Sequence, residues 1–175
     1  PTHDSDALVR NIYSKPTTNF INYLKKIKLE SSLKNKKIDK AIIREEIFNN
    51  PTKRKKLEKY IHVKIKKLRD KFLIKHKQKK TNIVFLDIPL LFENKLEKIC
   101  DYTILLYAPS KIRKKRAIKR KGMKESILNK IINNQLSDSV KKNKADFIIN
   151  TSFKKKNSYK KILEIINKIM KNKYA

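Results

Sequence analysis

The sequence predicts an α/β fold: a parallel sheet with helices on both faces and a separate helical insertion. Three observations support this fold class. An apolar run rich in β-branched residues at 82–87 is typical of a strand covered on both faces. Two further apolar runs, at 101–107 and 146–150, alternate with helical patterns, as in βαβ units. Residues 17–77, by contrast, carry helical patterns alone, which indicates an inserted helical region.

The first half of the chain is expected to hold four helices with identifiable starts. Asp6 is placed to cap a helix over 7–13, because its carboxylate accepts free backbone N–H groups. The other expected starts are Thr17 or Thr18, Asp39 before 40–49, and Pro51, with an exposed turn at Lys34–Lys37. The helix after Pro51 carries an apolar stripe made of Leu57, Ile61, Ile65, Leu68 and Phe72.

The second half is expected to alternate strands with helices around a Pro-Leu-Leu-Phe-Glu corner. This corner directly follows the strand at 82–87. Ligands of parallel sheets bind just beyond the carboxyl ends of strands, so Asp87 and Pro89 are candidates to line a cleft. The expected helices are a short one before 101, then 109–121, 123–135 with Ile127, Leu128, Ile131 and Ile132 inward, and 159–170.

The net charge of +31 is extreme and is carried mainly by lysine. Seven arginines leave 40 lysines among the 47 basic residues. Proteins that read nucleic acids rely on arginine for bidentate contacts, whereas lysine is a point charge on a flexible stem. Lysine, asparagine and isoleucine, all abundant here, share codons rich in A and T, so compositional bias is the favoured interpretation. An RNA- or ribosome-associated protein remains the alternative.

Cysteine, histidine and glycine usage excludes several classes of site. Cys100 is alone, so the sequence predicts no disulfide framework and a reducing, cytoplasmic location. His3, His62 and His76 are too scattered for a zinc site. No apolar run reaches the roughly 18 residues of a membrane span, and no signal peptide is visible. Gly122 is the only glycine, so these 175 residues contain no glycine-rich phosphate loop.

Several short motifs together resemble the dephospho-coenzyme A kinase family. The strongest is the segment Asp87–Glu93, which reads DIPLLFE. The others are Asp4-Ser5-Asp6, Ile38-Asp39-Lys40, Leu57-Glu58 with His62, Arg116 with Arg120, and Gln135 with 145–150. No single motif is decisive, but their order and spacing over almost the whole chain are specific.

The resemblance implies a P-loop kinase-like architecture and an ATP-dependent reaction. Residues 1–16 and 78–175 would form the core, with a lid at about 110–135, and 17–77 the coenzyme A-binding insertion. The family transfers the γ-phosphoryl group of ATP, with Mg²⁺, to the ribose 3′-hydroxyl of dephospho-coenzyme A, the last step of coenzyme A biosynthesis. The implied partners are these two substrates, without membrane or nucleic acid. A nucleotide kinase is a second alternative, although the insertion suits the coenzyme A-type acceptor better.

The resemblance also implies roles for individual residues. Asp6 would orient and deprotonate the 3′-hydroxyl, although helix capping alone also explains an aspartate there. Arg116 and Arg120, four residues apart, would share a helical face and converge on the phosphates. No metal-ligating set is assigned. The implied acceptor-binding residues are Asp4, His62, Asp87, Pro89 and Leu90, and the implied ATP-binding residues are Arg116, Arg120 and Asn150.

The sequence departs from the family pattern at three places. Val63 replaces the proline that follows the family's histidine, and Thr151-Ser152 replace a glycine. The family's first strand and its phosphate loop should precede Asp4, and the strand should lie between 82–87 and 101–107 in the sheet. Its absence leaves two strand edges unpaired. We therefore expect the chain to be an N-terminally incomplete copy that has no kinase activity as it stands. An upstream segment with the phosphate loop should restore that activity.

Overall fold

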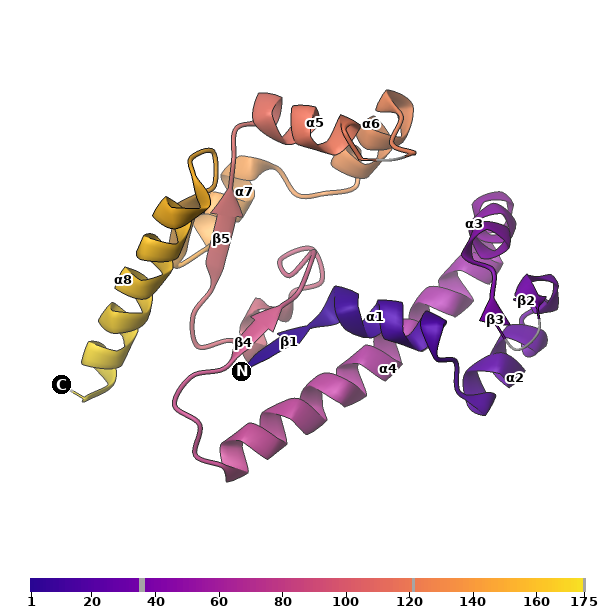
Figure 1. Cartoon of the computed structure of the whole chain (residues 1–175), viewed down its shortest axis with the longest axis horizontal. Helices are drawn as coiled ribbons and strands as arrows, with labels where there is room; N and C mark the ends of the chain where they lie inside the picture. The colour runs from indigo at the N-terminus through magenta and orange to yellow at the C-terminus, as the bar shows by residue number, and fades with distance from the viewer. Residues whose placement is uncertain (35–36, 121, 175) are drawn as a thin grey trace. The chain divides into compact units, whose positions relative to one another are not determined.

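The structure is a computed structural model that describes residues 1–34, 37–120 and 122–174 (Figure 1). The chain divides into two compact units, residues 1–89 and 90–175. Each unit has its own parallel strand pair and its own buried residues, which confirms the α/β class. Within the described ranges, no helix has both the length and the apolar character needed to cross a membrane.

Unit 1 combines one parallel strand pair with a bundle of helices. The pair consists of β1 (Thr2–Asp4) and β4 (Phe85–Asp87), in the register Thr2 with Phe85, His3 with Leu86 and Asp4 with Asp87. The helices are α1 (Ser5–Ser14), α2 (Thr18–Lys26), α3 (Lys40–Asn49), α4 (Pro51–Gln78) and the 3-10 turn η1 (Glu30–Ser32). Strands β2 (Leu33–Lys34) and β3 (Lys37–Ile38) pair antiparallel; the middle of the expected turn, 35–36, lies outside the described residues.

Most helix starts in unit 1 follow the expected capping chemistry. Thr17 Oγ1 accepts from Phe20 N at 3.3 Å, and Asp39 Oδ1 accepts from Ala41 N at 2.9 Å. Pro51 occupies the first turn of α4, as expected. The exception is α1. Its cap is Asp4, not Asp6, because β1 ends there in the extended backbone that an N-cap needs.

The core of unit 1 lies among α2, α3 and α4 rather than around the strands. Leu57 and Ile61 of the expected α4 stripe are buried, and Phe20 stacks on Tyr60 with ring centroids 5.3 Å apart. The fully packed cluster consists of Phe20, Leu24, Ile27, Leu29, Ile43, Leu57 and Ile61. The inserted region therefore folds around a core of its own.

The strand expected at 82–87 is shorter and less covered than its sequence suggests. Only Phe85–Asp87 pairs, and Phe85 is 36% exposed. The face that carries His3 and Leu86 packs on α4, where the His3 ring lies 5.6 Å from the Phe72 ring. The opposite face has no comparable cover within the described part of unit 1. The expectation of burial on both faces was therefore wrong for this strand.

Unit 2 is built around a second parallel pair. Strands β5 (Ile104–Tyr107) and β6 (Phe147–Asn150) pair from Ile104 with Phe147 to Tyr107 with Asn150. The helical elements are η2 (Leu96–Ile99), α5 (Ser110–Ile118), α6 (Glu125–Asn133), α7 (Asp138–Lys144) and α8 (Lys155–Tyr174). Both strands begin later than expected, and α7 was not expected at all. The last residue of the expected helix 109–121 lies outside the described residues.

The expected apolar face of α6 is mostly not buried. Leu128 is 7% exposed, whereas Ile127, Ile131 and Ile132 are 39–44% exposed. Helix α6 packs mainly on α5, a short helix with no buried residue of its own. Helical spacing places these four side chains on one side, but it does not supply a neighbour to cover them.

Four residues other than glycine adopt left-handed backbone in the described part of the chain. They are Lys28, Lys80, Leu90 and Lys95, with φ between 50° and 59°. Lys28 and Lys80 each follow a helix at the position where glycine is usual. Hydrogen bonds from Leu29 N to Leu24 O and from Thr81 N to His76 O, at 2.9 and 3.0 Å, close these helix ends.

Acidification is expected to destabilise unit 1 through His3, whose side chain is buried against α4. Burial and the neighbouring Arg69 lower the pKa of His3 below its ordinary value of 6.5, while Asp4 acts in the opposite direction. As the pH falls below 6.5, the unfolded chain binds a proton that the folded chain does not. The free energy of unfolding should therefore decrease from there down to the depressed pKa, and stay level above 6.5.

Urea unfolding at about pH 7.5 and about pH 5.5 tests this expectation. His3→Gln should lose less stability on acidification than the wild type. Some loss should remain, because burial and nearby positive charges also lower the pKa of His76. His62→Gln, at an exposed position of α4, is the control and should behave as the wild type. A His3→Gln variant with the full acid loss would contradict the assignment.

Candidate functional site

Two aspartates lie side by side at the carboxyl ends of β1 and β4. Asp4 and Asp87 are partners in the parallel register, so their Cα atoms are about 4.8 Å apart and their side chains share a face. This is the more exposed face of the pair, which also carries Phe85. The arrangement puts two carboxylates where parallel sheets bind ligands.

The two carboxylates differ in how they are held. Asp4 Oδ1 accepts from Ala7 N at 2.8 Å, and its Oδ2 lies 3.8 Å from Nη2 of Arg10. Asp87 is exposed, and its carboxylate makes no hydrogen bond or ion pair with any residue that the structure describes. Asp4 therefore has a structural role as the N-cap of α1. The carboxylate of Asp87 is available to bind a ligand.

Asp6 lies in the first turn of α1 with an exposed carboxylate. Since Asp4 caps this helix, capping no longer accounts for Asp6. Its carboxylate has no hydrogen-bond or salt-bridge partner within the described ranges. The free N–H groups and dipole of the helix N-terminus stabilise a negative charge there. Asp6 thus starts from a fixed backbone position in the first turn of α1, and its carboxylate is open to solvent.

The other expected residues of unit 1 are not all brought to these strand ends. Pro89 is exposed two residues after Asp87. His62 is exposed on α4, ten residues before Phe72, which contacts β1. Ten residues of helix measure about 15 Å. The structure therefore separates His62 from the carboxylates, and the buried structural histidine of this unit is His3.

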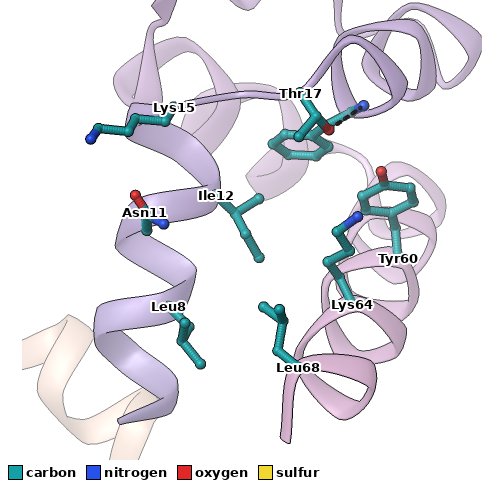
Figure 2. Close-up of a pocket in the computed structure, with 9 residues that line it drawn as sticks. Leu8, Asn11, Ile12, Lys15, Thr17, Tyr60, Lys64 and Leu68 are labelled. Atoms are coloured by element: carbon teal, nitrogen blue, oxygen red, sulfur yellow. Dashed lines mark hydrogen bonds between the residues drawn. The ribbon is translucent and has the colours of Figure 1, made fainter. Parts of the chain in front are cut away.

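A small cavity lies between α1 and α4 in unit 1 (Figure 2), with a volume of about 150 Å³. Figure 2 shows Leu8 and Ile12 directed towards Leu68, and Lys15 and Lys64 add positive charge to the lining. Helical spacing places Asp6 about 160° around α1 from Leu8. This cavity is therefore not the place where Asp6 acts, and it is smaller than a usual ligand pocket of about 300 Å³ or more.

In unit 2 the structure brings Arg116 to the loop that follows β6. Arg116 Nη2 donates to the carbonyl oxygen of Thr151 at 2.8 Å, next to Asn150. Asn150 Oδ1 accepts from Ser152 N at 2.9 Å, which shapes the loop. Thr151 and Ser152 stand where the family pattern has a glycine. The backbone N of Thr151 donates to Tyr107 O at 2.7 Å. The basic helix α5 and the loop that begins at Asn150 are therefore neighbours.

The sequence predicted that Arg116 and Arg120 share a helical face, but the structure contradicts this. Helix α5 ends at Ile118, and Arg120 lies in the turn that follows, with its backbone N bonded to Ala117 O at 3.0 Å. Its side chain is exposed. The helix ends early because the last turn tightens to i→i−3 bonding before Gly122, whose φ is 80°.

Sequence reasoning missed two contacts in unit 2. Arg113 Nη2 donates to Asp138 Oδ2, which joins α5 to α7. Glu93 pairs with Lys141 at 2.8 Å and accepts from Leu136 N at 3.1 Å. Glu93 stands in the DIPLLFE motif, so the motif was a signal that its last residue is constrained. Arg113 carried no such signal, because its partner lies 25 residues away in a helix that was not expected.

Three kinds of comparison with known proteins agree. The family model for dephospho-CoA kinase matches residues 1–157. A dephospho-CoA kinase of Bartonella henselae is 35% identical over 169 residues, 96% of this chain and 85% of that protein. One of Rhizobium etli is 29% identical over 166 residues, 95% of this chain and 80% of that protein. These matches span both units.

Solved structures agree with the sequence matches. A dephospho-CoA kinase from Campylobacter jejuni superposes with a TM-score of 0.68 at 26% identity, covering 98% of this chain and 86% of that one. A crystal structure from Thermus thermophilus superposes with a TM-score of 0.71 at 22% identity, covering 96% and 84%. The second likeness supports the fold alone.

The separate roles of Asp4 and Asp6 predict different effects on stability. Asp4→Ala removes the cap of α1 and should lower the free energy of unfolding by about 1 kcal/mol. Asp4→Asn, which can still accept from Ala7 N, should lose much less. Asp6→Asn should stay within about 0.5 kcal/mol of the wild type, since Asp6 caps nothing. Urea unfolding measures all three, and a large loss in Asp6→Asn would contradict its lack of a structural role.

Proposed function

This chain belongs to the dephospho-CoA kinase family, and we propose that Asp6 is the carboxylate that activates the acceptor hydroxyl. The family reaction transfers the γ-phosphoryl group of ATP to the ribose 3′-hydroxyl of dephospho-coenzyme A. The products are coenzyme A and ADP, and the step is the last of coenzyme A biosynthesis. The observation that supports the proposal is the exposed, partnerless carboxylate of Asp6, two residues beyond the end of β1.

The chemical step needs one base and little other covalent work. Asp6 accepts the proton of the 3′-hydroxyl as the new oxygen–phosphorus bond forms, and the bond between the γ-phosphorus and the bridging oxygen of ADP breaks. The carboxylate of Asp6 is exposed in the first turn of α1, where an acceptor hydroxyl can approach it. Asp4 supports the arrangement, because its cap fixes the first turn of α1 from which Asp6 projects.

The acceptor is proposed to lie near Asp6, Asp87 and Pro89 in unit 1. The exposed face at the ends of β1 and β4 supports this placement. We also assign acceptor binding to the helical insertion 17–77, which has its own core. The lysines of its neighbouring cavity, Lys15 and Lys64, suit a polar or anionic part of the acceptor. His62 and Leu90 keep the role that the family resemblance implies.

The ATP-binding residues are proposed to be Arg116, Arg120 and Asn150. The hydrogen bond from Arg116 to Thr151 O supports a nucleotide site in which the arginine lies beside the loop that begins at Asn150. The guanidinium group presents several donors in a plane, which suits phosphate oxygens. Arg120, exposed in the turn after α5, supplies a second positive charge.

Magnesium is the ion that such a reaction needs, and Asp87 fits it. Mg²⁺ prefers carboxylate oxygens and retains several waters, so one or two carboxylates and the phosphates suffice. Asp87 is exposed and free, and Asp4 lies beside it in the register. When bound, the ion neutralises charge on the phosphates. We place the enzyme in the cytoplasm, in keeping with its single cysteine, Cys100.

The acceptor base is tested by Asp6→Asn in the full-length protein. The amide cannot take the proton, so kcat should fall by at least about 10²-fold while KM for dephospho-coenzyme A changes little. A coupled ADP-release assay measures both constants. Asp101→Asn, at an exposed position of unit 2, is the matched control and should keep wild-type values. Turnover within about threefold of the wild type would refute the role of Asp6.

The nucleotide site is tested by Arg116→Lys. Lysine keeps the charge but loses the planar set of donors, so KM for ATP should rise about tenfold. KM for dephospho-coenzyme A should stay within about twofold. Lys115→Met, one position away on the exposed side of α5, controls for general loss of charge. If only the KM for dephospho-coenzyme A rises, Arg116 contacts the acceptor and not ATP, which would contradict the proposal.

A further inference from the structure

The carboxylate of Glu93 joins two segments of unit 2 that are distant in sequence. Its Oε1 accepts from the backbone N–H of Leu136 at 3.1 Å and lies 2.8 Å from Nζ of Lys141. Both side chains of this ion pair are 14% exposed. Among the ion pairs of the described residues, no other has both partners so well buried.

The pair is ionised and has a defined geometry. Burial alone would raise the pKa of Glu93, but the hydrogen bonds from Lys141 and from backbone N–H groups, Leu136 included, outweigh it and lower the pKa. A carboxylate shared between an ammonium and a backbone donor has little freedom to reorient. Removing its charge would leave the ammonium of Lys141 buried without a counter-ion.

The segment that Glu93 holds is the start of α7, and α7 in turn holds α5. Asp138, in the first turn of α7, accepts a hydrogen bond from Arg113 of α5. Arg113 and Arg116 are three residues apart and therefore lie on the same side of α5. The direction in which Arg116 projects thus depends on where α7 lies.

Helix α7 also contacts Tyr107, the residue to which the loop bonded by Arg116 is itself hydrogen-bonded. Lys142 Nζ lies 3.8 Å from the centre of the Tyr107 ring at the end of β5, and Figure 1 shows α7 beside β5. Tyr107 O accepts from Thr151 N at 2.7 Å and from Thr151 Oγ1 at 3.1 Å. Arg116 donates to the carbonyl of the same threonine. Both ends of the Arg116 contact are therefore supported by one helix.

Glu93 itself stands on a stiff turn. Leu90 and Lys95 adopt left-handed backbone, and Asn94 Nδ2 donates to Leu90 O at 2.9 Å. Leu96 N bonds to Leu91 O at 2.9 Å, and the Phe92 side chain is 6% exposed. A turn closed by these bonds offers the carboxylate a fixed base.

We propose that Glu93 is a positioning residue that sets the direction of Arg116 through α7. The inference rests on the proposed function, in which Arg116 binds ATP. Glu93, the last residue of the DIPLLFE corner, would thus affect the binding of the phosphoryl donor, ATP. The path runs from Glu93 to Leu136 and Lys141, and from Asp138 to Arg113.

Glu93→Gln in the full-length protein tests the proposal. Glutamine can still accept from Leu136 N, but it removes the charge that holds Lys141. KM for ATP should rise about tenfold, and KM for dephospho-coenzyme A should stay within about twofold. In the double variant with Arg113→Met, the rise should be smaller than the product of the two single effects, because both act through α7.

Glu97→Gln is the matched control. Glu97 pairs with Lys144, which is the last residue of α7, at 3.0 Å. This contact lies at the opposite end of α7 from Leu136 and Asp138. Both KM values of this variant should stay within about twofold of the wild type. Should circular dichroism show Glu93→Gln to be unfolded, Lys141→Gln tests the same link from the other side.

The outcomes separate the inference from the function on which it rests. An unchanged KM for ATP in Glu93→Gln, or an equal rise in both KM values, would overturn the positioning role. If Arg116→Lys raises KM for ATP while Glu93→Gln does not, the nucleotide site stands and the role of Glu93 fails. If Arg116→Lys has no effect, the proposed nucleotide site itself is wrong. Independent, multiplicative effects of Glu93→Gln and Arg113→Met would also contradict the shared path.

Discussion

The parallel pairing of β1 with β4 is the constraint on which the proposed acceptor site depends. The register puts Asp4 beside Asp87, and the end of β1 at Asp4 makes that residue the cap of α1. The cap in turn fixes Asp6 in the first turn. A slip of one residue would turn the side chains of a whole strand to the other face, and would place the cap and the free carboxylates on the wrong side. Three residue positions are thus set by one short ladder.

Local chemistry made the helix starts predictable, whereas burial and strand length were not. Thr17, Asp39 and Pro51 act within three residues of themselves, so the sequence contains all the information that these helix starts require. The DIPLLFE motif likewise identified the family, which the comparisons confirmed. The cap of α1 was misplaced because Asp4 and Asp6 are chemically equal, and only the end of β1 distinguishes them. The exposure of Ile131 depends on which neighbours pack against α6, and no local pattern carries that information.

The scarce arginines have contacts that the abundant lysines do not need. Lysine on a helix surface is satisfied by water, so its enrichment changes the net charge with little effect on packing. Arginine differs from lysine because its planar group carries several donors. The arginines with a contact among the described residues are Arg10, Arg54, Arg69, Arg113 and Arg116. The extreme charge of the chain is therefore compatible with an ordinary enzyme surface.

The left-handed lysines at helix ends show what the near-absence of glycine means for this chain. Lysine in this conformation is strained by about 1 kcal/mol relative to glycine, but glycine loses more conformational freedom on folding. The two effects oppose each other, so at Lys28 and Lys80 the unfolded-state effect offsets part of the backbone strain. No such balance exists where a backbone must approach a phosphate, because a side chain there occupies the space of the ligand. Drift in composition can thus erase glycine from the ends of helices and still be opposed by selection wherever the backbone itself is the binding surface.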